Sequence, residues 1–395
     1  MDRNLYYLWM RVDNKVTNAK IVKLLEYFGA PEEIYKADAN ALKSCKFLAE
    51  REIKALLDKD LGVAESEADM CELCHVGLLS IDDADYPEML RNIPEYPVLL
   101  YTMGDTSLLN TLCVTMVGAR KATPYGLSVG MTISQELAAA GFTIVSGFAV
   151  GGDSACHKGA LNVGGKTVAV LGAGIDVDYP SENKGLRQKL LAGGGLLVSE
   201  FPLGTPAYGK NFPFRNRVLS GLSFATIVVE GDKNSGALIT AKYAAEQNRD
   251  VFAVPGNITS SLSRGTNLLI QDGAVPILSS ADVGGDFYER YAPLLAQKAD
   301  KKEEGDPLDA LEPFSEPNWD AAPATPEEKF KEKPEIPMAD EVLAALSGGP
   351  LTLDEIAALS GLEVKEAASR LVLLELRGSV EKNGPNSYQL KKRQK

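Results

Sequence analysis

Cationic and aromatic side chains in the middle of the chain have the chemistry needed to hold a phosphate-bearing ligand. An arginine can contact a phosphate through two parallel hydrogen bonds, and an exposed phenylalanine can stack on an unpaired base. Residues 211–217 (Asn-Phe-Pro-Phe-Arg-Asn-Arg) combine both residue types. The alternative is structural, with both phenylalanines in the core and the arginines paired with Asp176 and Glu200. The candidate ligand contacts of this kind are Arg120, Lys121, Lys166, Lys184, Lys210, Phe214, Arg215, Asn216 and Arg217.

Glycine-containing turns before predicted helices form a second group of candidate ligand contacts. Residues 144–161 are typical of a buried strand, a loop from Ser146 to Gly152 and a helix, for which Asp153 or Ser154 is the expected N-cap. Small residues let a backbone approach a ligand closely, and a helix start attracts an anion. Such turns also occur without any ligand, and this one is neither a P-loop nor a dinucleotide-binding motif. The loop residues expected at a site are Gly118, Ser146, Gly147, Gly151, Gly152, Asp153, Ser235 and Gly236.

Two patterns that resemble catalytic or metal-binding motifs favour a structural interpretation. Asp153 and His157 are four residues apart and can share one helix face, where an acid–base pair could work. No nucleophile or metal-binding constellation accompanies them, so we interpret His157 as a residue that ties a helix to a neighbouring segment. Residues 71–75 (Cys-Glu-Leu-Cys-His) match a haem-attachment pattern, but no export signal and no second cysteine pair support haem or zinc. We therefore predict no catalytic residue, no metal and no cofactor.

Short apolar runs separated by helical segments indicate how these residues are positioned. Such runs predict an α/β fold with a mostly parallel sheet that is covered by helices on both faces. Thr123 and Pro124 are typical of the start of one of these helices. Ligands bind beyond the carboxyl ends of parallel strands, so we expect the cations of three loops to converge at that edge. The three groups are Arg120 and Lys121, then Lys166 and Lys184, then Lys210, Arg215 and Arg217. The expected strands are residues 114–117, 142–145, 167–171, 196–199, 225–229 and 251–254.

The composition divides the chain into four parts. Residues 1–78 are predicted to form a small helical domain that resembles a sterile alpha motif or a helix-hairpin-helix module, with an acidic turn that favours a packing or interaction role. Residues 79–295 form the α/β core, and residues 296–337 form an acidic, proline-rich linker. Residues 338–395 have three helical segments and a hairpin, a pattern typical of a winged helix. The predicted recognition helix of that domain is nearly neutral, so both DNA and protein remain candidate partners for it.

The net charge of −13 over 395 residues is unevenly distributed. Residues 113–281 carry 14 lysines and arginines against 11 acidic residues, so the core is basic within an acidic chain. Charge distribution matters more than total charge for binding an anion. No apolar run is long enough to span a bilayer, the N-terminus lacks signal-peptide features, and the 5 cysteines are scattered. We expect a cytoplasmic protein without a membrane partner.

A series of motifs in a fixed order resembles one known family. The resemblance is to the DNA-processing protein A family (DprA, also called Smf), and it covers about residues 86–281. The motifs that carry it are residues 86–87 (Tyr-Pro), 117–120 (Val-Gly-Ala-Arg), 146–147 (Ser-Gly), 152–153 (Gly-Asp), 172–176 (Gly-Ala-Gly-Ile-Asp), 179–180 (Tyr-Pro), 183–184 (Asn-Lys), 212–217 (Phe-Pro-Phe-Arg-Asn-Arg), 235–240 (Ser-Gly-Ala-Leu-Ile-Thr) and 265–267 (Gly-Thr-Asn).

The resemblance implies a Rossmann-like, doubly wound core that binds single-stranded DNA instead of a dinucleotide. It further implies a homodimer that loads the RecA recombinase onto incoming DNA during natural transformation. By motif position, Arg120 and Lys184 would be the main phosphate contacts, and Arg215 and Arg217 would border the pocket. The alternative function is a nucleotide-hydrolysing enzyme of the phosphoribohydrolase type, in which His157, Asp153 and Glu230 would supply acid–base groups. The chain lacks the Pro-Gly-Gly-x-Gly-Thr loop that such enzymes carry.

Overall fold

The computed structural model describes two compact units, Met1–Pro317 and Asn318–Lys395, and each is considered by itself. The described residues are 3–11, 15–283, 341–346, 349–362, 364, 367, 371, 374, 380–383 and 387–391. The predicted linker at 296–337 lies outside these residues. Within them, no helix is long and apolar enough to cross a membrane.

A nine-stranded sheet forms the centre of the first unit, in the order β1-β2-β6-β5-β4-β3-β7-β8-β9. The neighbouring strands β6, β5, β4, β3, β7, β8 and β9 all pair in parallel. In contrast, β2 pairs antiparallel with β6 and with β1. The mostly parallel sheet is confirmed, and the six expected strands agree with the structure to within one residue at each end. The bounds are β1 Gly77–Ser80, β2 Leu99–Gly104, β3 Cys113–Val117, β4 Thr143–Ser146, β5 Thr167–Leu171, β6 Leu196–Ser199, β7 Ala225–Val228, β8 Asp250–Ala253 and β9 Val275–Pro276.

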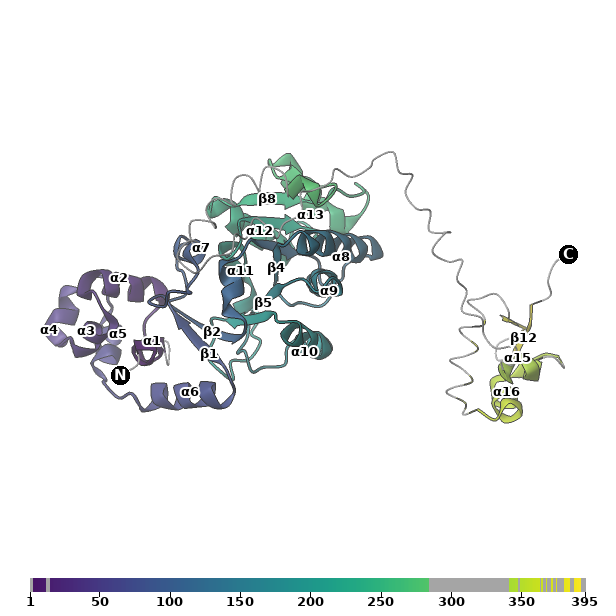
Figure 1. The fold of residues 1–395 in the computed structure, drawn as a ribbon, viewed down its shortest axis with the longest axis horizontal. Helices are drawn as coiled ribbons and strands as arrows, with labels where there is room; N and C mark the ends of the chain where they lie inside the picture. Colours follow the sequence, from purple (N-terminus) through teal and green to yellow (C-terminus); the bar gives the residue numbers. More distant parts are fainter. Residues whose placement is uncertain are drawn as a thin grey trace, which may run out of the picture. The chain divides into compact units, whose positions relative to one another are not determined.

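Helices cover both faces of the sheet, because side chains of the central strands alternate between two apolar layers. On one face, Val114 and Met116 of β3 join a buried cluster with Leu137 and Cys156. On the other face, Val117 belongs to a cluster that includes residues of α11 and α12. Figure 1 shows β4 and β5 with α11 on one side and with α8 and α9 on the other. The core helices are α7 Glu88–Arg91, α8 Pro124–Ala139, α9 Gly152–Asn162, α10 Lys184–Ala192, α11 Asn211–Gly221, α12 Gly236–Glu246 and α13 Arg264–Gln271, with 3-10 turns at Thr106–Asn110, Ser181–Asn183 and Ser261–Ser263.

The N-terminal segment is helical, as predicted. Helix α2 ends at Gly29, whose φ of 85° suits a glycine, and Pro31 begins α3. The buried side chains of Trp9 and Ile21 belong to the same hydrophobic cluster as Leu100 of β2, so these helices pack directly on the core. The likeness to a sterile alpha motif stays a prediction. The helices are α1 Arg3–Arg11, α2 Asn18–Phe28, α3 Pro31–Lys36, α4 Ala39–Ser44, α5 Glu50–Leu57 and α6 Gly62–Leu73.

The second unit contains α15 (Glu341–Ala345), α16 (Leu353–Ser360) and a three-stranded antiparallel sheet in the order β10-β12-β11. Thr352 opens α16 with a reciprocal bond to Glu355, and Gly361 ends it in the left-handed region, as the sequence indicates. The strands are β10 Leu351–Thr352, β11 Val380–Lys382 and β12 Ser387–Leu390. Most of the predicted third helix and the hairpin tip at 384–386 lie outside the described residues.

Candidate functional site

A hollow of about 630 Å³ opens at the carboxyl edge of the sheet, where the chain order reverses. From β3 the chain proceeds through β4, β5 and β6 in one direction and returns to β7 on the other side of β3. Open α/β sheets bind their ligands at such reversals. We call this space the switch-point hollow; its lining includes Gly118, Arg120, Lys121, Ala149, Asp153, Tyr179, Phe212, Arg215, Asn216, Asp232, Ser235 and Gly236.

Arg120 and two aromatic rings form a stacked rim on this hollow. The guanidinium carbon of Arg120 lies 5.0 Å from the centre of the Phe212 ring, and Phe212 lies 5.5 Å from the Tyr179 ring. Arg120 and Tyr179 are exposed, and Phe212 is half-buried. A cation beside accessible ring faces is suited to a phosphate and an unpaired base. Tyr179 was not among the predicted ligand contacts, although a tyrosine beside Pro180 in a loop after a predicted strand was a signal.

Lys184 lies at the same carboxyl edge of the sheet, at the start of α10. Its Nζ is 3.0 Å from the Asp178 carboxylate, and both side chains are largely exposed. The hydrogen bond from Lys184 lowers the pKa of Asp178 from its ordinary value. An exposed ion pair of this kind is weak and is open to exchange for another anion.

Arg215 is predicted to contact the ligand, but it is buried beneath the hollow. Its Nη1 donates to the carbonyl oxygens of Gly147 (2.9 Å) and Val170, and its Nε donates to Asn216 Oδ1 at 3.1 Å. Burial lowers the pKa of Arg215 to about 10. Asn216 in turn donates to the Gly236 carbonyl at 3.1 Å. Both side chains therefore hold the loops and helix starts that surround the hollow.

Asp153 is a buried internal anion at the start of α9. Its carboxylate accepts the backbone N–H of Gly118 (3.1 Å) and of Ala149 (3.2 Å). Burial raises its pKa, and the attraction of Arg215 opposes that shift. The expectation that Asp153 or Ser154 is the N-cap of this helix is wrong, because the helix begins at Gly152 after Gly151 as the N-cap. The Asp153 carboxylate thus occupies amides that we expected a ligand to contact.

The loop glycines bring two loops of the protein together. A Cβ on Gly118 would lie 2.9 Å from the Cα of Gly152, and a Cβ on Gly151 would lie 2.4 Å from the carbonyl oxygen of Arg120. The N–H of Gly152 donates to the Ala119 carbonyl at 3.0 Å. These glycines allow the β3 and β4 loops to touch, which fixes the backbone that presents Arg120.

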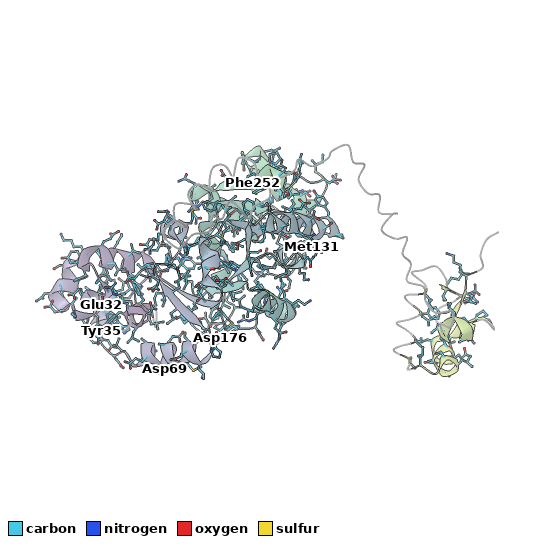
Figure 2. The ribbon with its side chains drawn as sticks, in the orientation of Figure 1. Glu32, Tyr35, Asp69, Met131, Asp176 and Phe252 are labelled. Atoms are coloured by element: carbon cyan, nitrogen blue, oxygen red, sulfur yellow. The ribbon has the colours of Figure 1, made fainter. Side chains whose placement is uncertain are left out.

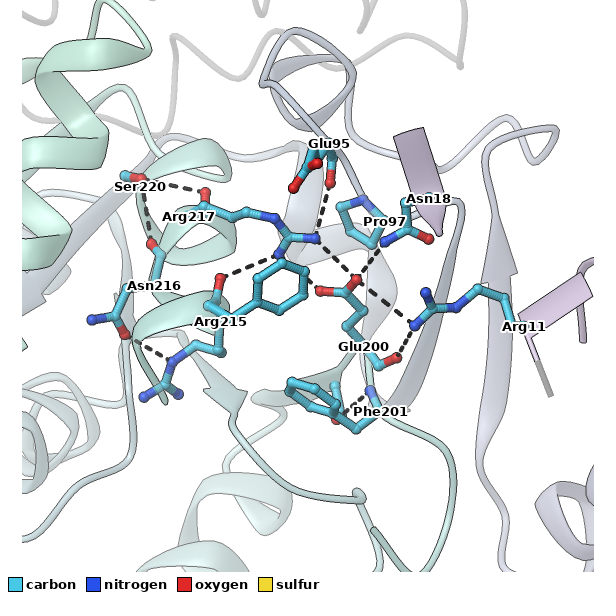
Figure 3. A network of polar contacts seen from close by, with 12 residues as sticks. Arg11, Asn18, Glu95, Pro97, Glu200, Phe201, Arg215, Asn216, Arg217 and Ser220 are labelled. Atoms are coloured by element: carbon cyan, nitrogen blue, oxygen red, sulfur yellow. Dashed lines mark hydrogen bonds and ion pairs between the residues drawn. The ribbon is translucent and has the colours of Figure 1, made fainter. Parts of the chain in front are cut away.

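Arg217 is also removed from direct ligand contact, because Glu200 neutralises it. Its two terminal nitrogens lie 2.8 and 2.9 Å from the Glu200 carboxylate oxygens, and both residues are buried. Figure 3 shows this pair with Asn18 and Arg11, which also contact Glu200. The expected ligand contact is wrong for Arg217, and its pairing with Glu200 in the structural alternative is confirmed; the two phenylalanines of that alternative are not core residues, because Phe212 is half-buried and Phe214 is exposed. The other partner proposed in that alternative, Asp176 (labelled in Figure 2), instead accepts the backbone N–H of Gly204 at 2.9 Å.

Lys166 lies at the opposite edge of the sheet from the hollow. It directly precedes β5, and its Nζ donates to the carbonyl oxygen of Gly193 (3.1 Å), which precedes the parallel strand β6. The prediction that it joins the carboxyl edge is wrong, since a residue before a strand lies at the amino end. Three other expected residues line the hollow: Lys121, Ser235 and Gly236. Phe214 instead lines a neighbouring space. Ser146 is buried, and its hydroxyl donates to the Met116 carbonyl at 2.6 Å.

His157 and Glu230 have structural partners. His157 Nδ1 lies 2.7 Å from Thr167 Oγ1, which itself donates to Ile144, so the imidazole is the donor in this contact. Burial lowers the pKa of His157 to about 3. Glu230 accepts the N–H and the hydroxyl of Thr123, at 2.8 and 2.7 Å. In the described part of the chain, no group of three or more potential metal ligands is assembled.

Comparisons with known proteins show which family the chain resembles. Residues 77–287 match the family model described as DNA recombination-mediator protein A, and residues 321–383 match a DprA winged helix domain. Protein Smf of Synechocystis sp. is 38% identical over 319 residues, which are 79% of each chain. DNA processing protein DprA of Streptococcus pneumoniae is 36% identical over 71% of this chain and 98% of its own length. The X-ray structure of that streptococcal protein matches with a TM-score of 0.64 over 72% of this chain and 98% of that chain.

Proposed function

Because the chain belongs to the DprA/Smf family of DNA recombination mediators, we propose that it binds single-stranded DNA at the carboxyl edge of its sheet. We further propose that it loads RecA onto this strand in natural transformation and has no enzymatic activity. The observation that carries the DNA-binding proposal is the exposed Arg120 over the ring of Phe212, which in turn contacts Tyr179, at the rim of a hollow of about 630 Å³.

The rim groups divide the contacts to the strand between phosphates and bases. Arg120, Lys121 and Lys184 are exposed cations that can reach phosphates, whereas Phe212 and Tyr179 offer ring faces to bases. Lys184 would exchange Asp178 for a phosphate. Stacking and phosphate contacts are tolerant of sequence, so we expect a preference for unpaired strands with little base specificity.

Exposed apolar side chains near the end of the core support the proposal of a homodimer. Ile258, Leu268, Val275 and Leu278 are 84%, 42%, 47% and 72% exposed, and β9 is the last strand of the sheet. Exposed apolar groups at a sheet edge are typical of a protein interface. Sedimentation of the full chain should show a dimer that Leu278→Glu converts to a monomer, and a monomeric wild-type chain would contradict the proposal.

The rival enzymatic function has less support from the same residues. Each proposed acid–base group already has a structural partner. Asp153 accepts from backbone amides, His157 contacts Thr167, and Glu230 accepts from Thr123. Nucleotide hydrolysis that Glu230→Gln abolishes in the purified protein would favour the enzyme.

The DNA-binding proposal is tested by fluorescence anisotropy with a labelled oligonucleotide across a salt series. The double variant Arg120→Ala, Lys184→Ala should bind the single strand at least tenfold more weakly, and its salt slope should be shallower by about 1.4. Lys166→Ala is the matched control, because this lysine lies at the other edge of the sheet and should leave both quantities unchanged. Equal binding by the double variant, or tighter binding of duplex, would contradict the site.

RecA loading needs a separate assay. With single-stranded DNA covered by a single-strand-binding protein, the wild-type chain should shorten the lag before RecA filaments form. The Arg120→Ala, Lys184→Ala variant should lose this effect if loading depends on the DNA site. No effect of the wild-type chain on the lag would contradict the proposal of loading while leaving DNA binding intact.

A further inference from the structure

A second hollow, of about 400 Å³, lies beside the first, where the N-terminal helices meet the core. Residues 207–214 separate the two spaces. Ala207, Gly209, Phe212 and Pro213 line the switch-point hollow, whereas Tyr208, Lys210, Asn211 and Phe214 line the second. We call the second space the junction hollow; the rest of its lining is Arg11, Val16, Thr17, Asn18, Ala19, Glu95, Phe201, Pro202 and Thr205.

The junction hollow has accessible aromatic surface and cations. Tyr208 is 53% exposed and Phe214 is 37% exposed, which is unusual for rings beside a cavity of this size. Lys210 Nζ lies 6.0 Å from the centre of the Tyr208 ring. The lining has two cationic residues, Lys210 and Arg11, and one acidic residue, Glu95; Arg11 also contacts Glu200, so Lys210 is the cation that a ligand would meet. This combination favours a flat, anionic ligand.

Helix α2 begins at this hollow. Thr17, Asn18 and Ala19 of its first turn belong to the lining, and the Thr17 side chain makes no capping hydrogen bond. The first amides of an 11-residue helix favour a phosphate.

Two buried carboxamides of the lining provide an independent observation. Asn211 and Asn18 are 6% and 4% exposed, and neither Asn211 Nδ2 nor Asn18 Oδ1 has a hydrogen-bond partner in the described part of the chain. Buried polar atoms are nearly always paired in folded proteins. Asn211 and Asn18 both line this space, and the edge of a nucleobase presents both kinds of group; to pair with it, these two buried atoms would have to turn toward the space.

We propose that the junction hollow binds one nucleotide of the same DNA strand that occupies the switch-point hollow. The base stacks on Tyr208 and Phe214, and the phosphate lies toward Lys210 and the first turn of α2. The strand crosses residues 207–214 between the two hollows. This inference rests on the proposed single-strand binding and extends it to the N-terminal helices.

The test uses a 20-nucleotide oligo-dT and full-length variants with unchanged melting temperature. Tyr208→Leu should bind the strand about tenfold more weakly, since a base stack contributes this order of affinity. Lys210→Gln should also bind more weakly, and its salt slope should be shallower by about 0.7, since it removes one phosphate contact. Tyr27→Leu is the matched control: Tyr27 is 57% exposed on α2 and does not line the hollow. A strand that carries 5-iododeoxyuridine should crosslink to Tyr208 or Phe214 under ultraviolet light.

Each other outcome overturns a defined part of the proposal. If Tyr208→Leu and Lys210→Gln bind like wild type while Arg120→Ala, Lys184→Ala loses affinity, the junction hollow is excluded and the proposed function stands. If wild type itself does not bind the strand, the proposed function fails and this inference fails with it. If free thymidine monophosphate at micromolar concentration abolishes the crosslink without releasing the strand, the ligand is a free nucleotide and not part of the strand.

Discussion

At Gly147 the backbone passes between a buried carboxylate and a buried guanidinium. A Cβ at this position would lie 2.7 Å from Asp153 Oδ2 and 2.8 Å from Arg215 Nη2. Because Asp153 accepts two backbone N–H groups and Arg215 donates to two carbonyl oxygens, displacing either group disrupts these bonds, and Gly147→Ala should lower the free energy of unfolding by about 1–3 kcal/mol. Chemical denaturation measures this change. Gly185→Ala is the control, since a Cβ there meets nothing within 4 Å and alanine favours the helix; equal stability of the two variants would contradict the steric argument.

The burial of His157 predicts a loss of stability in acid. Its folded pKa is about 3, whereas the unfolded chain takes up the proton near 6.5. Between these values only the unfolded state is protonated, so the free energy of unfolding should fall as pH falls, by up to about 1.4 kcal/mol per pH unit. Asp153 contributes with the opposite sign, because burial raises its pKa. The wild-type slope alone therefore does not isolate His157.

Comparison of variants isolates the histidine. His157→Gln keeps a donor for Thr167 but removes the titration, so its stability should depend less steeply on pH between 6.5 and 4. His75→Gln replaces the exposed histidine and should keep the wild-type slope. Urea denaturation at several pH values measures both. A wild-type slope in His157→Gln would show that another group causes the acid sensitivity.

Residue types were easier to predict than residue partners. The sequence located Arg120, Lys184, Arg215 and Arg217 in the loops and helices near one edge, because charged residues after apolar runs are visible in the sequence. It did not show that Arg217 faces Glu200 or that Arg215 binds carbonyl oxygens, since both contacts join segments that only the fold brings together. Burial is what separates the arginines that bind a ligand from those that hold the site.

At the scale of elements, the apolar runs predicted the six central parallel strands well, because strands buried on both faces are continuous apolar segments. β1, β2 and β9 were not predicted: β1 and β9 are short, and the apolar run at residues 98–101, which forms β2, was not assigned to a strand. Lys166 was misplaced because it precedes the apolar run of β5 and so lies at the amino end of that strand. The prediction assigned it to the carboxyl edge, where the residues that follow the strands lie. The direction of a strand, and not only its position, decides which loops share a site.

The start of α8 depends on a residue far along the chain. Thr123 Oγ1 accepts the N–H of Gly126 at 3.1 Å, and the Glu230 carboxylate accepts from Thr123. Glu230→Ala would leave the amide and hydroxyl of the partly buried Thr123 without this acceptor, so the free energy of unfolding should fall by about 2 kcal/mol. Glu230→Gln keeps one oxygen and should recover part of the loss. Denaturant unfolding checks both variants, and a fully stable Glu230→Ala would show that Thr123 caps the helix without help.

At the scale of the whole first unit, one buried carboxylate joins the N-terminal helices to the core. Glu200 is 3% exposed and contacts Arg217 of α11, Asn18 of α2 and Arg11 of α1 (Figure 3). The helical pattern of residues 1–78 predicted a small domain of its own, yet the structure attaches it to the core through Arg11 and Arg217, one from each side. The position of α2, and with it the junction hollow, thus depends on the same network that neutralises Arg217.

Removal of this carboxylate should therefore loosen the N-terminal helices from the core. Glu200→Ala leaves the Arg217 charge buried without a partner, which costs about 3–5 kcal/mol, and it removes the acceptor of Asn18. Amide hydrogen exchange should become faster in the first turn of α2 while the strands of the sheet keep their protection. Glu246→Ala is the control, because its ion pair with Lys242 is exposed, with 3.7 Å between the charged atoms, and should contribute almost nothing. If exchange in α2 is the same in both variants, the helices are held by their apolar contacts alone, and Glu200 serves only to neutralise Arg217.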